Sequence, residues 1–205
     1  MRDDISMLLE LADYRAAVAG LYAEVTHTSH PEATWETWRQ ERAALLATHP
    51  QSPFSGRPGS TRPEFHPYDP TWRVLGRVIP ETDGPPLHVE QADGSAEHFD
   101  PIGSVEFVRS EQRHALPLYW LRGYSGGLFL PFADATNGDT TYGSGRYLLD
   151  QAKSAFLGFE DGRLVLDFNF AYHPSCVWGD WICPLPHAES RLDVRVEAGE
   201  RATPA

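Results

Sequence analysis

The chain has 205 residues, of which 41% are apolar and 22% are charged, and its formal net charge at pH 7 is −12. This length and composition indicate one globular domain that can bury well over half of its unfolded surface. A strongly negative surface repels phosphate backbones and anionic lipids, so neither nucleic acid nor a membrane is an expected partner.

The sequence also predicts where the protein is found. The N-terminus lacks the apolar run of a secretory signal, and no apolar stretch approaches the ~20 residues needed to cross a bilayer. We therefore expect a cytoplasmic protein. In that compartment Cys176 and Cys183 are expected to be thiols or metal ligands rather than a stable disulfide.

Two amphipathic helices are predicted at the N-terminus. Apolar residues recur at helical spacing over residues 5–26, and again over residues 31–47, where Trp35 and Trp38 share a face. Pro31 suits the first turn of the second helix. We expect both helices to pack on a sheet, with the two tryptophans buried.

A segment rich in proline and glycine follows the helices. Such a composition predicts an irregular connection that lies on the surface. The predicted organisation is therefore a helical segment at 1–48, a connection at 49–70 and a β domain at 71–205.

From residue 71 onward the pattern is one of short strands. Turn signals such as Asp83-Gly84 and Asn137-Gly138 separate apolar, alternating runs. The predicted strands cover residues 72–79, 87–90, 96–99, 104–108, 114–121, 127–132, 146–149, 163–170 and 192–196. We expect a mainly β (α+β) fold, in which an antiparallel β-sandwich or barrel-like sheet carries two N-terminal helices.

Long, collinear strings in the C-terminal two-thirds carry a family resemblance. They span residues 127–136 (GLFLPFADAT), 141–147 (TYGSGRY), 166–172 (LDFNFAY), 174–176, 183–186, 189–192 and 197–200. On these strings the chain resembles the bacterial and archaeal family called domain of unknown function 1684. The resemblance implies no known activity. Members often have Asn at the position of His173, Pro near His187 and Asn at the position of Ser190.

Polar residues shared with that family pattern form the candidate ligand site. They are Asp134, Thr136, Tyr142, Arg146, Asp167, Asn169, Tyr172 and Glu189. An arginine beside carboxylates can hold the carboxylate of a small ligand through two hydrogen bonds. The same residues can instead form a buried network that only fixes the fold. The sequence leaves both interpretations open.

Two short segments resemble a zinc site. His173-Pro-Ser-Cys176 and Cys183-Pro-Leu-Pro-His187 supply two thiols and two imidazoles, which zinc binds in a tetrahedron. The loop between the cysteines is short and bounded by prolines, so we expect no cofactor and keep zinc as the alternative. The cysteines are then structural thiols or a redox pair. Cys176, with His173 as its base, is the candidate catalytic residue.

The favoured function is the binding of a small polar or carboxylate-bearing molecule, and whether the protein is also an enzyme stays open. One alternative is a non-catalytic interaction or scaffold module, in which the polar cluster is structural and residues 49–70 meet a partner. The other is a small zinc-binding protein. A polar cluster on an open pocket favours the first hypothesis, and a buried, fully paired cluster favours the second.

Overall fold

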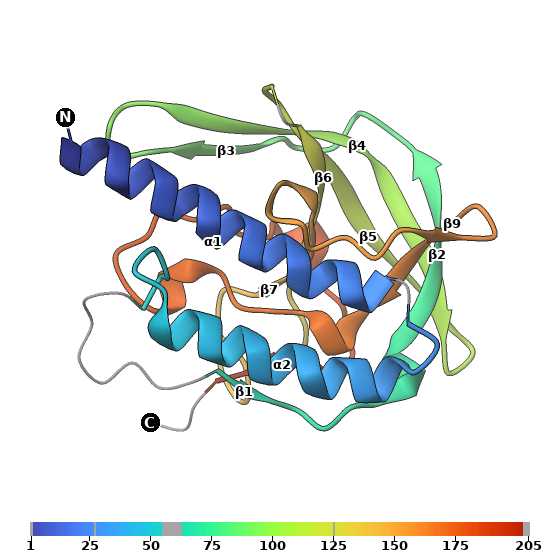
Figure 1. Ribbon diagram of the computed structural model, residues 1–205. Coiled ribbons are helices and arrows are strands. Elements are labelled where there is room, and N and C mark those ends of the chain that lie inside the picture. The colour runs from blue at the N-terminus through green and yellow to red at the C-terminus, as the bar shows by residue number, and fades with distance from the viewer. Residues whose placement is uncertain (1, 27, 55–62, 125, 203–205) are drawn as a thin grey trace.

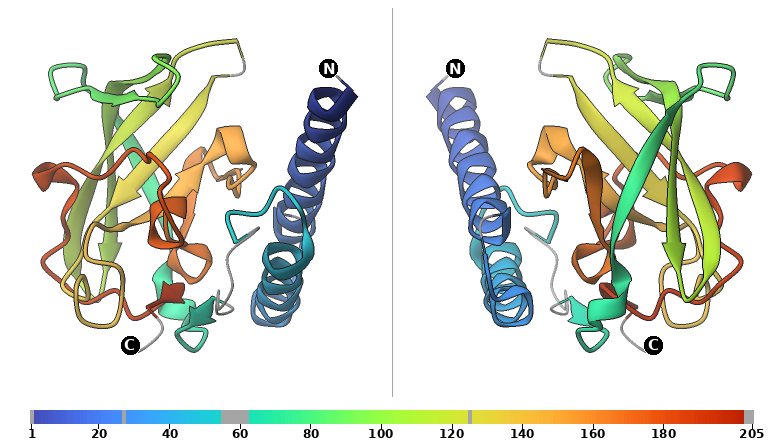
Figure 2. Two further views of the ribbon diagram at one scale, coloured as in Figure 1. Left: turned by 90° about the vertical axis from the view of Figure 1, so that its left-hand side faces the viewer. Right: turned by 90° about the vertical axis from the view of Figure 1, so that its right-hand side faces the viewer.

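Two helices lie along one side of a curled β-sheet in the computed structural model of the chain (Figure 1). The structure describes residues 2–26, 28–54, 63–124 and 126–202. α1 (Arg2–Thr26) leads into α2 (Pro31–Thr48), which returns beside it. Figure 2 shows the two helices as a layer of their own against the sheet. Neither helix, in the part of the chain that is described, is long and apolar enough to cross a membrane.

The sheet has eight strands, all paired antiparallel, in the order β7-β6-β5-β4-β2-β9-β8, with β3 added to one end of β4. The strands are β2 (Arg73–Pro80), β3 (Leu87–Glu90), β4 (Ala96–Arg109), β5 (Gln112–Leu121), β6 (Gly127–Phe132), β7 (Arg146–Asp150), β8 (Phe159–Glu160) and β9 (Arg163–Asp167). A separate two-stranded pair joins β1 (Glu64–Phe65) to β10 (Glu200–Arg201). The predicted fold class, a barrel-like antiparallel sheet with two N-terminal helices, is confirmed.

The structure departs from the predicted strands in three places. The segments 96–99 and 104–108 form one strand, because the register shift between Pro101 and Gly103 lets β4 continue along β5. The predicted strand 163–170 ends at Asp167, whose carboxylate accepts a hydrogen bond from the Asn169 amide and starts a 3₁₀ turn. Residues 192–196 are not a strand.

The core has two parts. One part fills the sheet and the C-terminal segment, and includes Trp72, Phe132 and Phe168. The other lies between the helices and the sheet, where Trp35 and Trp38 are 6% and 2% exposed. The prediction that both tryptophans are buried against the sheet is thus confirmed, and the helices close the second core layer. Residues 55–62 of the predicted connection lie outside the described ranges.

Strand β2 changes its partner along its length. Its first half, up to Gly76, pairs with β9, and its second half, from Arg77, pairs with β4. A Cβ atom at Gly76 would overlap the Val105 side chain, so this position needs glycine. The change of partner separates the first half of β2 from the end of β4 and opens a groove on the sheet.

Candidate functional site

Arg146 on β7 is the centre of a buried network. Its Nη2 donates to Asp134 Oδ2 at 2.9 Å and to the Val196 carbonyl at 2.8 Å. Its Nη1 donates to the carbonyls of Ala198 and Glu200. The side chain is fully buried, and burial lowers its pKa, an effect that Asp134 opposes. The guanidinium therefore ties the C-terminal segment to the sheet.

Asp134 is saturated with donors. Its Oδ1 accepts from the Thr136 amide at 2.7 Å, the Thr136 hydroxyl at 2.6 Å and the Val196 amide at 3.2 Å. The Thr136 hydroxyl also lies 2.8 Å from that of Thr141. Asp134, Thr136 and Arg146 thus meet as the sequence predicts, but they are buried and paired within the chain and line neither open hollow, which favours the structural interpretation of this cluster over a ligand site.

Glu200 is a member of this network that the sequence interpretation missed. Its Oε1 accepts from Arg42 Nε of α2 at 2.8 Å, and its Oε2 accepts from the His173 amide at 2.8 Å. All three residues are buried. The signal was present, because Glu200 ends one of the family strings, but Arg42 lies 158 residues away in sequence. The network therefore joins the second helix to the β domain.

His173 is held neutral within this network. Its Nε2 accepts from the Tyr142 amide at 3.3 Å, and its Nδ1 lies 3.7 Å from Glu200 Oε2. Burial lowers the pKa of His173 to about 3, and the positive charge of Arg146 acts in the same direction. Because Nε2 is already an acceptor, the proton of the neutral ring belongs on Nδ1.

Asp167 and Asn169 form a second, separate cluster. Asn169 Oδ1 accepts from the Asp69 amide and its Nδ2 donates to the Asp69 carbonyl, both at 2.9 Å. The Asn169 carbonyl accepts from Trp35 Nε1 at 2.8 Å. Burial raises the pKa of Asp167 to about 6. Asn169 thereby holds the 3₁₀ turn, the segment before β2 and helix α2 together.

The remaining predicted site residues are dispersed. The Tyr172 hydroxyl donates to Asp150 Oδ2 at 3.2 Å, and the Tyr172 ring lies under the Arg42 guanidinium. Tyr142 is half-buried, and Glu189 is exposed. The structure therefore brings Asp134, Thr136 and Arg146 together and places the other five candidates in different surroundings.

The two cysteines are free and half-buried. Burial raises the pKa of Cys176 to about 11, and the neighbouring Cys183 adds to the effect. The Cys176 sulfur lies 3.8 Å from the Tyr142 hydroxyl. His187 faces the Pro86 carbonyl at 3.3 Å. Over the described ranges no group of three or more His, Cys, Asp or Glu side chains is arranged to hold a metal ion.

Two open hollows lie outside the buried networks. The first, which we call the arginine groove, has a volume of about 700 Å³ and lies where β2 leaves β4. Its lining combines a basic rim with an apolar floor. The lining residues are Arg73, Val74, Leu75, Arg77, Glu106, Phe107, Val108, Arg113, His114, Ala115 and Arg163. The sequence interpretation missed these arginines, although Arg73 and Arg77 share a face of β2 by strand alternation.

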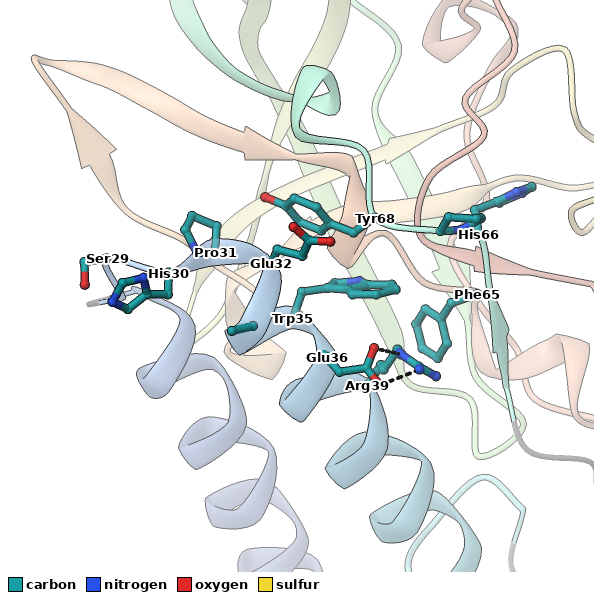
Figure 3. Close-up of a pocket in the computed structure, with 12 residues that line it drawn as sticks. Ser29, His30, Pro31, Glu32, Trp35, Glu36, Arg39, Phe65, His66 and Tyr68 are labelled. Atoms are coloured by element: carbon teal, nitrogen blue, oxygen red, sulfur yellow. Dashed lines mark hydrogen bonds and ion pairs between the residues drawn. The ribbon is translucent and has the colours of Figure 1, made fainter.

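The second hollow, which we call the aromatic groove, has a volume of about 860 Å³ and lies between the start of α2 and the segment 65–68 (Figure 3). Three aromatic side chains, from Trp35, Phe65 and Tyr68, gather around it. The Trp35 and Tyr68 rings are 5.6 Å apart, and those of Trp35 and Phe65 are 6.2 Å apart. The groove is thus built jointly by the helical segment and the β domain.

Comparisons with known proteins place the chain in a family. Its fold is similar to the solution NMR structure of an uncharacterized protein of Haloarcula marismortui, with a TM-score of 0.58 and 29% sequence identity over 83% of this chain and 94% of that chain. No curated protein matches the chain. Residues 61–201 match the family described as "Protein of unknown function (DUF1684)". The sequence strings, the curled sheet that carries them and this match agree: the chain belongs to the DUF1684 family.

Proposed function

We propose that this chain is a cytoplasmic protein that binds a small carboxylate-bearing molecule with an apolar body, and that the ligand occupies the arginine groove. One observation carries the proposal. Four arginines and a single carboxylate line the groove, whereas the whole chain has 17 basic and 29 acidic residues. Arg73, Arg77 and Arg163 lie beside Glu160, Glu106 and Asp161, so the positive charge left to attract an anion is that of Arg113.

The arginines of the groove are available to different degrees. Arg73 forms a hydrogen-bonded ion pair with Glu160, and Arg77 lies 3.6 Å from Glu106. Among the described residues Arg113 has no ion-pair partner, and its side chain is exposed beside Val108 of the neighbouring strand. A free guanidinium offers parallel N–H donors that match the geometry of a carboxylate.

The floor of the groove suits the apolar part of such a ligand. Leu75 and the exposed Val108 come from the two strands that separate, whereas Phe107, which is buried in the core, and its cross-strand partner His114 lie on the opposite face. Burial lowers the pKa of His114, and Arg109 acts in the same direction, so the ring stays neutral at pH 7. The floor is therefore apolar while the rim is cationic, and this combination selects an amphipathic anion.

A thermal-shift and calorimetric titration tests the proposal. The probes are benzoate, phenylacetate and succinate, with inorganic phosphate as a carbon-free anion. An aromatic carboxylate should bind more tightly than phosphate, because only the former fills the apolar floor. Arg113→Gln should weaken that binding about tenfold, the effect of losing one charge-assisted hydrogen-bonded contact.

Arg15→Gln is the matched control, because Arg15 is an exposed arginine on α1 and does not line the groove. It should leave the affinity unchanged. Equal weakening by Arg113→Gln and Arg15→Gln would show that only the overall charge matters. Absence of binding by every carboxylate would contradict the proposal.

A further inference from the structure

The aromatic groove is a second surface with the character of a binding site. Trp35 lies at its base, only 6% exposed, with its indole nitrogen bonded to the Asn169 carbonyl, so the half-buried rings of Tyr68 and Phe65 are the ones a ligand can reach. Tyr68 and Phe65 stand on either side of the Trp35 ring (Figure 3). Pro31 and Pro67 also line the hollow. Flat rings and prolines side by side form a surface on which other rings can stack.

The charges at the groove are arranged with a free carboxylate at one end. Glu32, in the first turn of α2, is exposed and has no ion-pair partner among the described residues. At the other end Glu36 is already bound by Arg39, with contacts of 2.7 and 2.5 Å. The Arg39 guanidinium lies over the Trp35 ring, 5.3 Å from its centroid. The unpaired charge of the groove is therefore negative and lies beside Tyr68 (Figure 3).

The shape of the hollow favours an extended ligand over an enclosed one. The groove is open along α2, and its helical lining runs from Pro31 to Arg39. At 1.5 Å per residue this stretch is about 12 Å long. A polyproline II segment rises 3.1 Å per residue, so about four residues of such a peptide span it.

We propose that the aromatic groove docks an extended, proline-containing peptide that carries one basic residue. Its prolines stack on Tyr68 and Phe65, because a preformed polyproline II helix loses little entropy on binding an aromatic-lined groove. Its basic residue pairs with Glu32, and the negative net charge of the chain attracts that residue. This surface is distinct from the arginine groove, so the proposal is independent of the proposed small-molecule function.

Tyr68 has a second role in the docking of the peptide. Burial raises the pKa of Tyr68 to about 12, with Asp167 acting in the same direction, so its hydroxyl stays protonated at neutral pH. Among the described residues that hydroxyl makes no hydrogen bond within the chain. A polyproline II segment has no internal hydrogen bonds, so its carbonyls are open to such a donor. Tyr68 thus supplies both a stacking face and a donor.

Fluorescence anisotropy with a labelled peptide tests the inference. The probe is fluorescein-Arg-Pro-Pro-Ala-Pro-Pro-Ala, added to the full chain at low salt. One companion peptide has Glu in place of Arg, and another has Gly in place of every Pro. Saturable binding of the probe, weakened by both replacements and by added salt, is expected. No saturation up to about 1 mM would overturn the proposal.

Variants place the binding on the groove. Glu32→Gln should lower the affinity for the probe about threefold, which is the effect expected from losing one exposed ion pair. Tyr68→Ala should weaken it at least about tenfold, as expected when a central aromatic contact is removed. Tyr68→Phe keeps the ring and removes only the hydroxyl, so its affinity for the probe should lie between that of Tyr68→Ala and that of the unaltered chain. The melting curve of each variant shows whether its fold is intact.

Glu41→Gln is the matched control, since Glu41 is an exposed carboxylate on the same helix that does not line the groove. It should bind like the unaltered chain. If Glu32→Gln and Glu41→Gln weaken probe binding equally, the attraction depends only on the net charge of the chain, and the proposed docking site is wrong. If free arginine competes as well as the peptide, and the Gly-substituted peptide binds equally, the groove is a site for a small cation and the peptide proposal is wrong.

Discussion

Arg146 and Asp134 form an ion pair, 2.9 Å between Nη2 and Oδ2, in which the two side chains are 0% and 1% exposed. The pair belongs to a network in which Nη1 and Nη2 of Arg146 also donate to backbone carbonyls and Asp134 accepts from Thr136 and Val196. Such a network fixes the positions of strand β7, the loop after β6 and the C-terminal segment relative to one another.

The first prediction concerns the cost of breaking this pair. Arg146→Ala leaves a buried carboxylate and several carbonyls without donors, so it should lower the free energy of unfolding by about 3–5 kcal/mol. Urea denaturation at pH 7 measures the change. Arg195→Gln is the control, because Arg195 pairs with Asp139 and Glu197 at the surface and should leave the midpoint nearly unchanged. Equal midpoints for Arg146→Ala and the unaltered chain would contradict a structural role.

The second prediction follows from the raised pKa of Asp167. Between its ordinary value of 3.8 and the folded value of about 6, the folded chain holds a proton that the unfolded chain has lost. Stability from this group is therefore lost as the pH rises through about 6. Asp167→Asn keeps an oxygen acceptor for Asn169 and should stabilise the fold at pH 7 by on the order of 2 kcal/mol. Unfolding curves at pH 7 and pH 3.5 measure this, and the gain should vanish at pH 3.5.

A loss of stability in Asp167→Asn at pH 7 would show that the charged carboxylate is itself required. That outcome would restore Asp167 as a candidate ligand-binding residue, as the sequence suggested.

The third prediction concerns His173, whose pKa is lowered to about 3 from an ordinary 6.5. Between these values the unfolded chain binds a proton that the folded chain does not, so stability falls as the pH is lowered from 6.5 towards 3. The slope is at most about 1.4 kcal/mol per pH unit. His173→Asn, which removes the titrating ring, should flatten this part of the stability–pH curve. An unchanged slope in the variant would mean that other groups cause it.

The fourth prediction separates the roles open to Cys176 and Cys183. We expect protein purified without chelator to contain no stoichiometric zinc and to yield two thiols per chain in a titration under denaturing conditions. In the folded chain Cys176 should react slowly with alkylating reagents at pH 7, because its pKa is raised to about 11 and the thiolate is the nucleophile.

Elemental analysis can contradict this expectation. One zinc per chain, with a melting temperature that falls when chelator is added, would promote the zinc hypothesis, since metal binding would then contribute to folding. A titration that finds thiols only after reduction would identify a disulfide instead.

The sequence predicted the architecture because its signals are local. Helical periodicity located both N-terminal helices, and alternation with Asn-Gly or Asp-Gly turns located most strands. The strand at 163–170 was overestimated because Phe168 and Phe170 look like strand residues, whereas the Asp167 carboxylate caps a 3₁₀ turn. A hydrogen bond between a side chain and a nearby amide outweighed the apolar pattern.

The arrangement of the sites was less predictable because it depends on long-range pairing. Polar residues of the family strings were identified, but whether Arg146 faces a pocket or the interior depends on the fold of the C-terminal segment around it. The arginine groove arises because β2 changes partner at Gly76. No periodicity in the sequence reports that change, so the convergence of Arg73 and Arg113 could only be seen in three dimensions.

The most direct test of the proposed function is to map where an aromatic carboxylate binds. The measurement is a titration of the ¹⁵N-labelled chain with phenylacetate, followed by ¹H–¹⁵N correlation spectra. Saturable shifts should concentrate at residues 73–77, 106–108 and 113–115. Arg113→Gln should lower the affinity obtained from these shifts about tenfold. Shifts concentrated at residues 29–39 and 65–68, or no saturable shifts, would contradict the assignment of the arginine groove as the ligand site.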